Sequence, residues 1–235
     1  MTGSPEVLRV QLAAYTASFR YAHFLTGQQP TYPLPPPTTI YGLLAAALGE
    51  YPPPGELAFA YRFDAQGTGW DLEHLHIAQP GGVKDFPHPP NLKAIVTPTL
   101  REFFLQPRLT LYLRAPALDR WVDTFRAPRY ALSLGRSQDL ATVRSVDVFV
   151  PPRRTAVYWA GSLLPAERES EAPGGILLTL PTWLDPTDRR ISRFGRFVAL
   201  VRPQSAVAAQ EVEVDPGQPS FQGRPWGLIW HHFDA

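Results

Sequence analysis

Apolar and polar residues alternate along four stretches of the chain, and this period of two is typical of β-strands buried on one face. In the third stretch Leu109, Leu111 and Leu113 fall on one side, and polar or aromatic residues on the other. Two further stretches read as helices: an alanine-rich apolar run that ends near Gly49, and a run that begins near Pro116, where proline is tolerated. The predicted strands are 8–14, 57–63, 108–114 and 142–151, and the predicted helices are 40–48 and 116–126.

The order of these elements predicts the fold class. Along residues 1–151 the chain reads strand, helix, strand, a long excursion, strand, helix, strand. That is the βαββαβ order of the ferredoxin-like fold, which RNA-recognition (RRM-like) modules share. The excursion, residues 64–98, is rich in Gly, Pro and His, and such a long stretch without a strong pattern is often functional. We therefore expect an α+β, ferredoxin-like domain with a protruding β-hairpin, whose mobile tip lies near 80–90.

The remaining residues, 152–235, contain no strong helical pattern. Four short apolar stretches separated by Pro and Gly turns predict strands, so we expect a smaller β-rich C-terminal subdomain packed on the first domain. The polar stretch 167–175 is the segment that we expect to form a disordered loop. The predicted strands are 174–183, 193–201, 208–214 and 225–233.

The composition limits the class of protein. With 235 residues, 44% hydrophobic and 18% charged, the chain can bury a sizeable core and is neither disordered nor membranous in character. No apolar run approaches the roughly 18 residues of a membrane-spanning helix, and the N-terminal residues lack the pattern of a signal peptide. The chain has no Cys, which excludes disulfides and thiolate chemistry. We expect a cytoplasmic protein without a membrane partner.

The basic residues gather in the middle of the chain, although the net charge is only +1. Residues 101–154 carry ten arginines and five acidic residues, whereas the segments on either side carry more acidic than basic residues. The whole chain has only two lysines, Lys84 and Lys93. Codon usage explains the high ratio of arginine to lysine, but it does not explain the clustering. Arginine binds phosphates at two points and stacks on bases, so the cluster favours nucleic acid as a partner.

Most catalytic and cofactor motifs are absent. The chain lacks Gly-x-Ser-x-Gly, Gly-x4-Gly-Lys-Ser/Thr and Gly-x-Gly-x-x-Gly, so we expect no cofactor. The two histidines of 74–76, beside Glu73, lack a third metal ligand at suitable spacing, so we expect no metal. Tyr41, His88 and Lys93 could supply the acid, base and cation of metal-independent RNA cleavage. An endoribonuclease is therefore the first alternative to an RNA-binding function, and a protein–protein adaptor without RNA contact is the second.

The segment 126–139 is the best candidate for a binding site. Gly135 allows a tight turn, Ser137 can cap the residues after it, and Tyr130 offers a stacking face. Three arginines of this segment add forked guanidinium groups. These features predict a cradle for the phosphates and sugars of a nucleic acid. The alternative is an ordinary loop between helix and strand with solvated arginines.

Several motifs match a known family. With them the chain resembles the fifth family of CRISPR-associated (Cas) proteins, of the RAMP superfamily, in the form found in type I-B and related systems. The resemblance covers residues 7 to about 150 well and the C-terminal third only loosely. The motifs are Phe19-Arg20, Thr31-Tyr32-Pro33, Pro35-Pro36, Thr38, Tyr41-Gly42-Leu43-Leu44, Gly49, Arg101-Glu102-Phe103-Phe104, Pro107 and Leu134-Gly135-Arg136-Ser137-Gln138-Asp139-Leu140.

The resemblance implies a ferredoxin-like domain with a protruding hairpin, the thumb, at the excursion 64–98. It also implies a subunit of Cascade, the type I surveillance complex. Such a subunit grips and caps the 5′ handle of the CRISPR RNA (crRNA), and it touches the terminal backbone subunit and the large subunit, with target DNA close by. One branch of the family cleaves repeat RNA with Tyr, Lys and His. No Lys-His pair aligns after the thumb, where this chain reads Thr97-Pro98-Thr99-Leu100-Arg101-Glu102, which favours a non-catalytic member.

The proline-rich segment 33–37 fits this interpretation because it fixes the path into the first helix. Thr38 or Thr39 can cap that helix, and a nucleic-acid end held there would meet backbone donors, the helix dipole and aromatic faces. The alternative is that the prolines only tether a helix that packs on the sheet. The predicted RNA-binding residues are Arg20, Tyr32, Thr38, Tyr41, Arg101, Arg108, Arg126, Arg129, Tyr130, Gly135, Arg136 and Ser137, and the predicted thumb contacts are Lys84, Phe86, His88 and Lys93.

Overall fold

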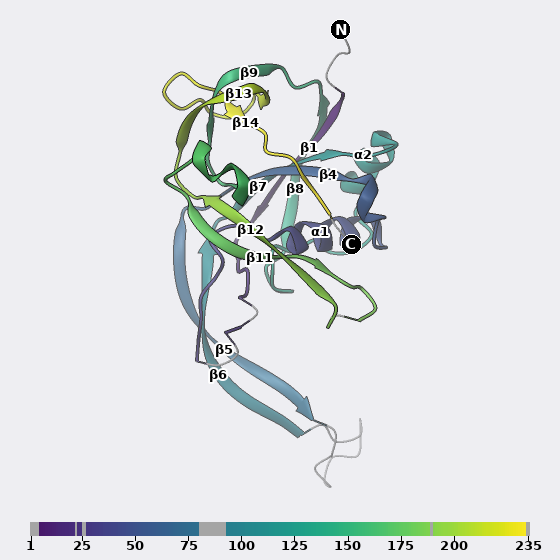
Figure 1. Ribbon diagram of the computed structural model, residues 1–235. Coiled ribbons are helices and arrows are strands. Elements are labelled where there is room, and N and C mark those ends of the chain that lie inside the picture. Colours follow the sequence, from purple (N-terminus) through teal and green to yellow (C-terminus); the bar gives the residue numbers. More distant parts are fainter. Residues whose placement is uncertain (1–4, 22, 25–26, 80–92, 189, 234–235) are drawn as a thin grey trace.

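A five-stranded antiparallel sheet forms the centre of the molecule (Figure 1), in the order β15-β4-β7-β1-β8. The computed structural model describes residues 5–21, 23–24, 27–79, 93–188 and 190–233. With few helices and much sheet, the protein belongs to the α+β class. The elements of this central unit are β1 (Val7–Ala14), β4 (Ala58–Asp64), β7 (Arg108–Arg114), β8 (Ala141–Phe149), β15 (His231–His232), α1 (Pro37–Leu48) and α2 (Leu118–Arg126).

Both helices contribute to a core on one face of this sheet. Leu109 and Leu111 of β7 are fully buried, and they share a hydrophobic cluster with Leu43 of α1 and Trp121 of α2. The four strands and two helices of this part therefore lie where the sequence predicts, with ends shifted by three residues or fewer. Within the described residues, neither helix has the length and apolar character needed to cross a membrane.

Between β4 and β7 the chain makes a long antiparallel hairpin, β5 (Gly67–Gln79) and β6 (Lys93–Leu105), which extends away from the central sheet (Figure 1). Two short strands, β2 (Thr16–Ala17) and β3 (Gln28–Gln29), pair with β6 near its base. The expected excursion thus forms a hairpin that continues to Leu105. The tip that we expected to be mobile, near 80–90, lies outside the described residues.

The residues after 151 form further strands that return to the central sheet. One group is the sheet β10-β12-β11, a second joins β13, β14 and β9, and the last strand, β15, pairs with β4. Leu163, Trp183 and Phe233 lie in the same hydrophobic cluster as the two helices. The elements are β9 (Arg153–Trp159), β10 (Ser162–Pro165), β11 (Ile176–Leu184), β12 (Ser192–Leu200), β13 (Gln204–Asp215), β14 (Trp226–Gly227) and the 3₁₀ helices η1 (Pro54–Glu56) and η2 (Ala166–Glu171).

The expected disordered loop at 167–175 is wrong, because η2 occupies much of it. Arg168 and Glu171 lie three residues apart and form two hydrogen bonds of 2.6 and 2.8 Å. The guanidinium of Arg168 also lies 5.5 Å from the ring centre of Trp159, and Ala172 is buried. These contacts order a stretch that looks like a solvated loop from its composition.

The buried His231 provides a test of how the last strand is held. Its Nε2 lies 3.1 Å from the carbonyl oxygen of Leu163, and burial lowers its pKa to about 4. The unfolded chain, with an ordinary histidine pKa near 6.5, binds more protons between these two values. The free energy of unfolding should therefore fall by about 3 kcal/mol as the pH drops from about 6.5 to about 4.

Chemical denaturation across this pH range measures the effect. A His231→Gln variant, which can still donate to Leu163, should show a flatter profile. His232→Gln removes the exposed neighbouring histidine and should keep the wild-type slope. Equal slopes for the wild type and His231→Gln would contradict the assignment.

Candidate nucleic-acid interface

The first helix begins without a side-chain cap. Its N-cap residue is Pro36 and its first residue is Pro37, so the predicted cap at Thr38 or Thr39 is wrong. Proline suits the first helical position because its φ is preset and the first N–H groups have no intrahelical partner. The first turn carries no acidic residue. The positive end of the helix dipole is therefore not neutralised from within α1.

A loop rich in arginine runs along this helix. We call residues 126–137 the arginine loop. The N–H groups of Arg129 and Tyr130 donate to the carbonyl oxygens of Ala47 and Ala46, at 2.9 and 3.1 Å. These are carbonyls of the last turn of α1, which lack partners within the helix. Gly49 ends the helix with φ +90°, and a Cβ there would lie 2.6 Å from Cγ of Arg129. The close approach holds the loop against α1.

Gly135 fixes the other end of the arginine loop. Its φ is +102°, and a Cβ at this position would lie only 1.9 Å from the carbonyl oxygen of Ser18. The neighbouring Leu134 donates its N–H to the carbonyl oxygen of Asp139 at 2.9 Å. The predicted tight turn at Gly135 is confirmed, and it requires glycine for both conformation and space.

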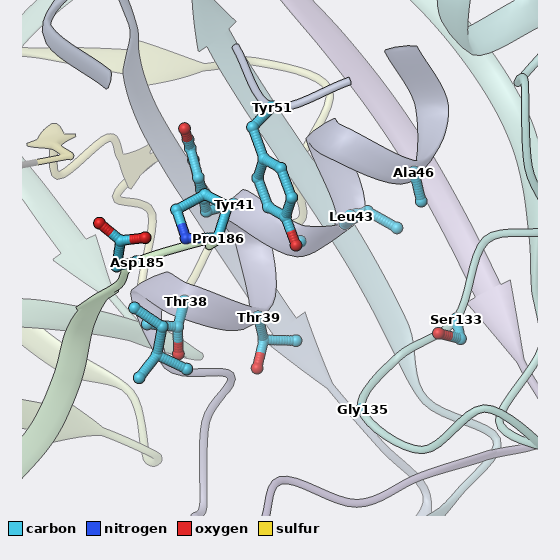
Figure 2. Close-up of a pocket in the computed structure, with 12 residues that line it drawn as sticks. Thr38, Thr39, Tyr41, Leu43, Ala46, Tyr51, Ser133, Gly135, Asp185 and Pro186 are labelled. Carbon is cyan, nitrogen blue, oxygen red and sulfur yellow. The ribbon is translucent and has the colours of Figure 1, made fainter. Parts of the chain in front are cut away.

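A pocket of about 360 Å³ lies between the start of α1 and this turn. Figure 2 shows Thr38 and Thr39 on one side, Ser133 and Gly135 on another, and Asp185 and Pro186 nearby. A hydrogen bond of 2.6 Å from Thr187 to Asp185, joined by backbone N–H donors, lowers the pKa of that carboxyl group. The pocket therefore combines hydroxyl groups with a carboxylate. Such a set suits the hydroxyls of a sugar better than a bare phosphate.

The exposed arginines and the exposed aromatic ring lie in the first part of the arginine loop, residues 126–130. Arg126 and Arg129 are exposed, and neither forms an ion pair within the described residues. Tyr130 is 59% exposed and lines the same surface hollow. Free guanidinium groups beside a free aromatic face are what a single-stranded nucleic acid needs for phosphate contact and base stacking.

Two of the predicted phosphate contacts instead hold the structure together. Nε of Arg101 lies 2.9 Å from Glu73, and Arg136 bonds the other oxygen of the same carboxylate. Arg136 also bonds Asp139 at 2.8 Å. The side chains of Arg101, Glu73 and Arg136 are only 5%, 18% and 14% exposed. We call this set the Glu73 bridge. It ties the hairpin to the arginine loop and leaves both arginines little freedom to bind RNA.

Two predicted aromatic contacts are also buried. Tyr32 is packed with its ring centre 3.6 Å from that of Tyr21, so its face is covered. Tyr41 packs against Trp183 and Phe233, and its hydroxyl donates to the carbonyl oxygen of Pro52 at 2.5 Å. Burial raises the pKa of Tyr41. These two rings serve the core, and neither offers a stacking face.

The other predicted residues are dispersed. Arg20 and Ser137 are exposed, and Arg108 is exposed on β7. Lys84, Phe86 and His88 lie outside the described residues. Lys93 begins β6, but its side chain is not among those that the structure describes.

Among the described residues no group of three or more His, Asp or Glu side chains is placed to hold a metal ion, and the side chain of His76 is not among those that the structure describes. Glu73 is held by the two arginines of the Glu73 bridge, and successive residues of a strand point to opposite faces, so His74 lies on the other side. Sequence reasoning missed Tyr51, Ser133 and Asp185, which line the pocket in Figure 2. The only feature of the local sequence that could have indicated these three residues is their position beside a turn or a helix end.

The fold is of the α+β class, and the arginine loop exposes two arginines and a tyrosine on its surface. A family model described as CRISPR-associated protein (Cas_Cas5) matches residues 7–171. The chain therefore belongs to this family of CRISPR-associated proteins. No curated protein sequence matches the chain.

Two solved structures are similar to this chain. A chain of a CRISPR RNA-guided surveillance complex is 20% identical, covers 90% of this chain and 95% of its own length, and has a TM-score of 0.53. A CRISPR protein from Archaeoglobus fulgidus is 14% identical over 91% of this chain and 97% of its own length, with a TM-score of 0.48. The first likeness shows a shared fold.

Removing the charge at the centre of the Glu73 bridge should destabilise the protein. In a Glu73→Gln variant, the nearly buried Arg101 loses its carboxylate, which should cost about 2–3 kcal/mol. The melting temperature should fall by roughly 5–10 °C, as measured by differential scanning calorimetry.

The matched control is Glu50→Gln. Glu50 pairs with Arg120 at 3.3 Å, but the two side chains are 70% and 64% exposed. Its loss should change stability by less than about 0.5 kcal/mol. If the two variants melt alike, the bridge is not the constraint that its burial implies.

Proposed function

We propose that this protein is a non-catalytic RNA-binding subunit of a type I Cascade surveillance complex, where it binds and caps the 5′ handle of crRNA. Membership of the CRISPR-associated family supports the proposal. The shared fold with a chain of a CRISPR RNA-guided surveillance complex is consistent with it. The observation that carries it is the surface of the arginine loop, where two exposed arginines, without an ion pair among the described residues, line one hollow with an exposed tyrosine.

The finer fold assignment is part of the same proposal. The strand order β4-β7-β1-β8, with α1 after β1 and α2 after β7, supports a ferredoxin-like βαββαβ domain. The hairpin of β5 and β6 would then be the thumb. We keep the division into a domain of residues 1–151 and a β-rich subdomain of 152–235 as a prediction.

The arginine loop suits an RNA backbone because it is already held in place. Arg129 and Tyr130 are anchored through backbone hydrogen bonds to α1, and Gly135 sets the turn. A rigid loop loses little conformational entropy when a ligand binds. The hydroxyl-lined pocket beside Thr38 would accept a ribose of the handle, since the 2′-hydroxyl can both donate and accept.

Protein partners would use the hairpin. Trp70, Leu72 and Leu100 are exposed there. Leu72 pairs with Leu100 in register, and Trp70 lies two residues before Leu72, so the three side chains share one face. Exposed apolar side chains grouped in this way are typical of interaction surfaces. We assign this face to the terminal backbone subunit or the large subunit, with target DNA close by.

Catalysis is not part of the proposal. A general base must reach the proton that it removes. The hydroxyl of Tyr41, one of the candidate catalytic groups, is buried and already donates to the carbonyl oxygen of Pro52. This arrangement supports a binding role over the endoribonuclease alternative.

Replacing the open arginines should weaken RNA binding. In Arg126→Ala/Arg129→Ala, affinity for a single-stranded RNA carrying the 5′ handle should fall roughly tenfold or more. The slope of log affinity against log salt should become shallower by about 1.4, because about 0.7 is lost per phosphate contact. Fluorescence polarisation over a salt series measures both quantities.

The control and the catalytic readout use the same RNA. Arg202→Ala removes an arginine that is exposed and forms no ion pair with any described residue, and it should leave the affinity near the wild-type value. The RNA should remain intact after incubation with the wild type in EDTA. Unchanged binding by the double variant would contradict the RNA-binding proposal. Specific cleavage that Tyr41→Phe abolishes would favour the endoribonuclease.

A further inference from the structure

A second open surface lies on the sheet face opposite the helices. Ala13 pairs with Arg108 on β7 and with Thr142 on β8, so these three residues share a face. Leu12 and Leu109, on the other face, are buried with the helices. The shared face borders a groove of about 490 Å³, within the size range of ligand pockets. We call it the sheet groove; it is lined by Ala13, Ala14, Tyr15, Gln106, Pro107, Arg108, Leu140, Thr142 and Arg144.

The sheet groove presents an uncovered aromatic ring. Tyr15 is 87% exposed, more than any other large hydrophobic or aromatic residue among those that the structure describes. Leu140, which also lines the groove, is exposed. No described ring packs against Tyr15. Tyr15 and Leu140 therefore form an exposed apolar group at the groove, and such groups are typical of interaction surfaces.

The groove is positively charged. Arg108 and Arg144 are exposed, and neither forms an ion pair among the described residues. The cross-strand neighbour of Arg108 is Asp64, which pairs with Arg62 at 4.0 Å instead. No acidic residue lines the groove. Two unpaired guanidinium groups beside a free ring therefore face the same space.

The backbone around the groove is rigid. The chain leaves the central sheet for the hairpin sheet at Tyr15 and returns at Gln106 and Pro107. At this crossing Gln106 donates its N–H to the carbonyl oxygen of Tyr15 (2.8 Å), and Ala14 donates to that of Pro107 (3.1 Å). Gln106 has φ +46°, an uncommon value for a residue other than glycine. Such strained conformations often mark functional sites when the structure around them is fixed.

We propose that the sheet groove binds a nucleotide of a single-stranded nucleic acid, with the base stacked on Tyr15 and the adjoining phosphates held by Arg108 and Arg144. Stacking on an aromatic ring together with backbone charge contacts is how proteins hold single strands without reading their sequence. The inference goes beyond the proposed function, because no arginine of the arginine loop lines the sheet groove; the two hollows adjoin at Thr142, which lines both. RNA and DNA share this chemistry, and the test separates them.

The test measures binding of short oligouridine and oligothymidine probes to the full-length protein. Tyr15→Ala should weaken binding by about fivefold to 100-fold, whereas Tyr15→Phe, which keeps the ring, should stay within about twofold. Arg108→Ala/Arg144→Ala should reduce the salt slope by about 1.4. The matched control for the ring is Phe194→Ala, an exposed aromatic on β12, and for charge it is Arg202→Ala.

Photocrosslinking locates the contact. A probe carrying 4-thiouridine, or 4-thiothymidine in the DNA arm, should crosslink to the peptide that contains Tyr15. Crosslinking in either arm supports the inference and identifies which nucleic acid enters the groove. The inference is wrong if the groove variants bind both probes like the wild type, or if they weaken only association with another protein.

This outcome is separable from that of the proposed function. Loss of handle binding in Arg126→Ala/Arg129→Ala, with no effect of the groove variants on either probe, would reject the groove alone. Loss of probe binding in the groove variants, with normal handle binding by the loop variant, would support the groove and reject the arginine loop as the handle site.

Discussion

The shared carboxylate of Glu73 is the constraint on which the arrangement of this surface depends. One carboxylate pairs with both Arg101 of the hairpin and Arg136 of the arginine loop, and Asp139 supplies the second negative charge to Arg136; the side chains of Glu73 and the two arginines are largely buried. Removing one partner of such a set leaves a charge without compensation in a poorly solvated place. The direction of the hairpin and the position of the loop are therefore fixed together. Because Arg136 faces inward, the exposed cations of the loop are Arg126 and Arg129.

Local pattern is sufficient to locate strands whose burial alternates. Leu109, Leu111 and Leu113 are all fully buried, as their period of two predicts. The pattern fails for β9, where four exposed residues precede three buried ones. Its buried end is covered by residues distant in the sequence, for example Trp226 of β14, which pairs with Tyr158. No signal within residues 153–159 reports that partner, so this strand could not be predicted.

In the candidate site, too, some features could be predicted from the local sequence and others could not. The turn at Gly135 was predictable because only glycine tolerates its backbone conformation and its contact with Ser18. Whether an arginine or a tyrosine is free to bind depends on partners that the local sequence does not reveal. Tyr41 is covered by Trp183 and Phe233, which lie more than 140 residues away along the chain. Composition therefore located the basic segment, but it could not separate the exposed arginines, Arg126 and Arg129, from those that pair with Glu73.

The sheet groove lies where the chain passes between the central sheet and the hairpin, so the same crossing accounts for both features. Two neighbouring strands leave the central sheet together, and two backbone hydrogen bonds close the crossing, from Gln106 to Tyr15 and from Ala14 to Pro107. A side chain at such a corner has no strand beside it to pack on, so Tyr15 remains exposed. The C-terminal residues cover the other end of this sheet face, where Asp215 accepts hydrogen bonds from Arg9 and Tyr112. That cover does not extend to Arg108 and Arg144. The geometry that projects the hairpin thus also leaves a rigid, positively charged groove beside its base, and rigidity lowers the entropic cost of binding there.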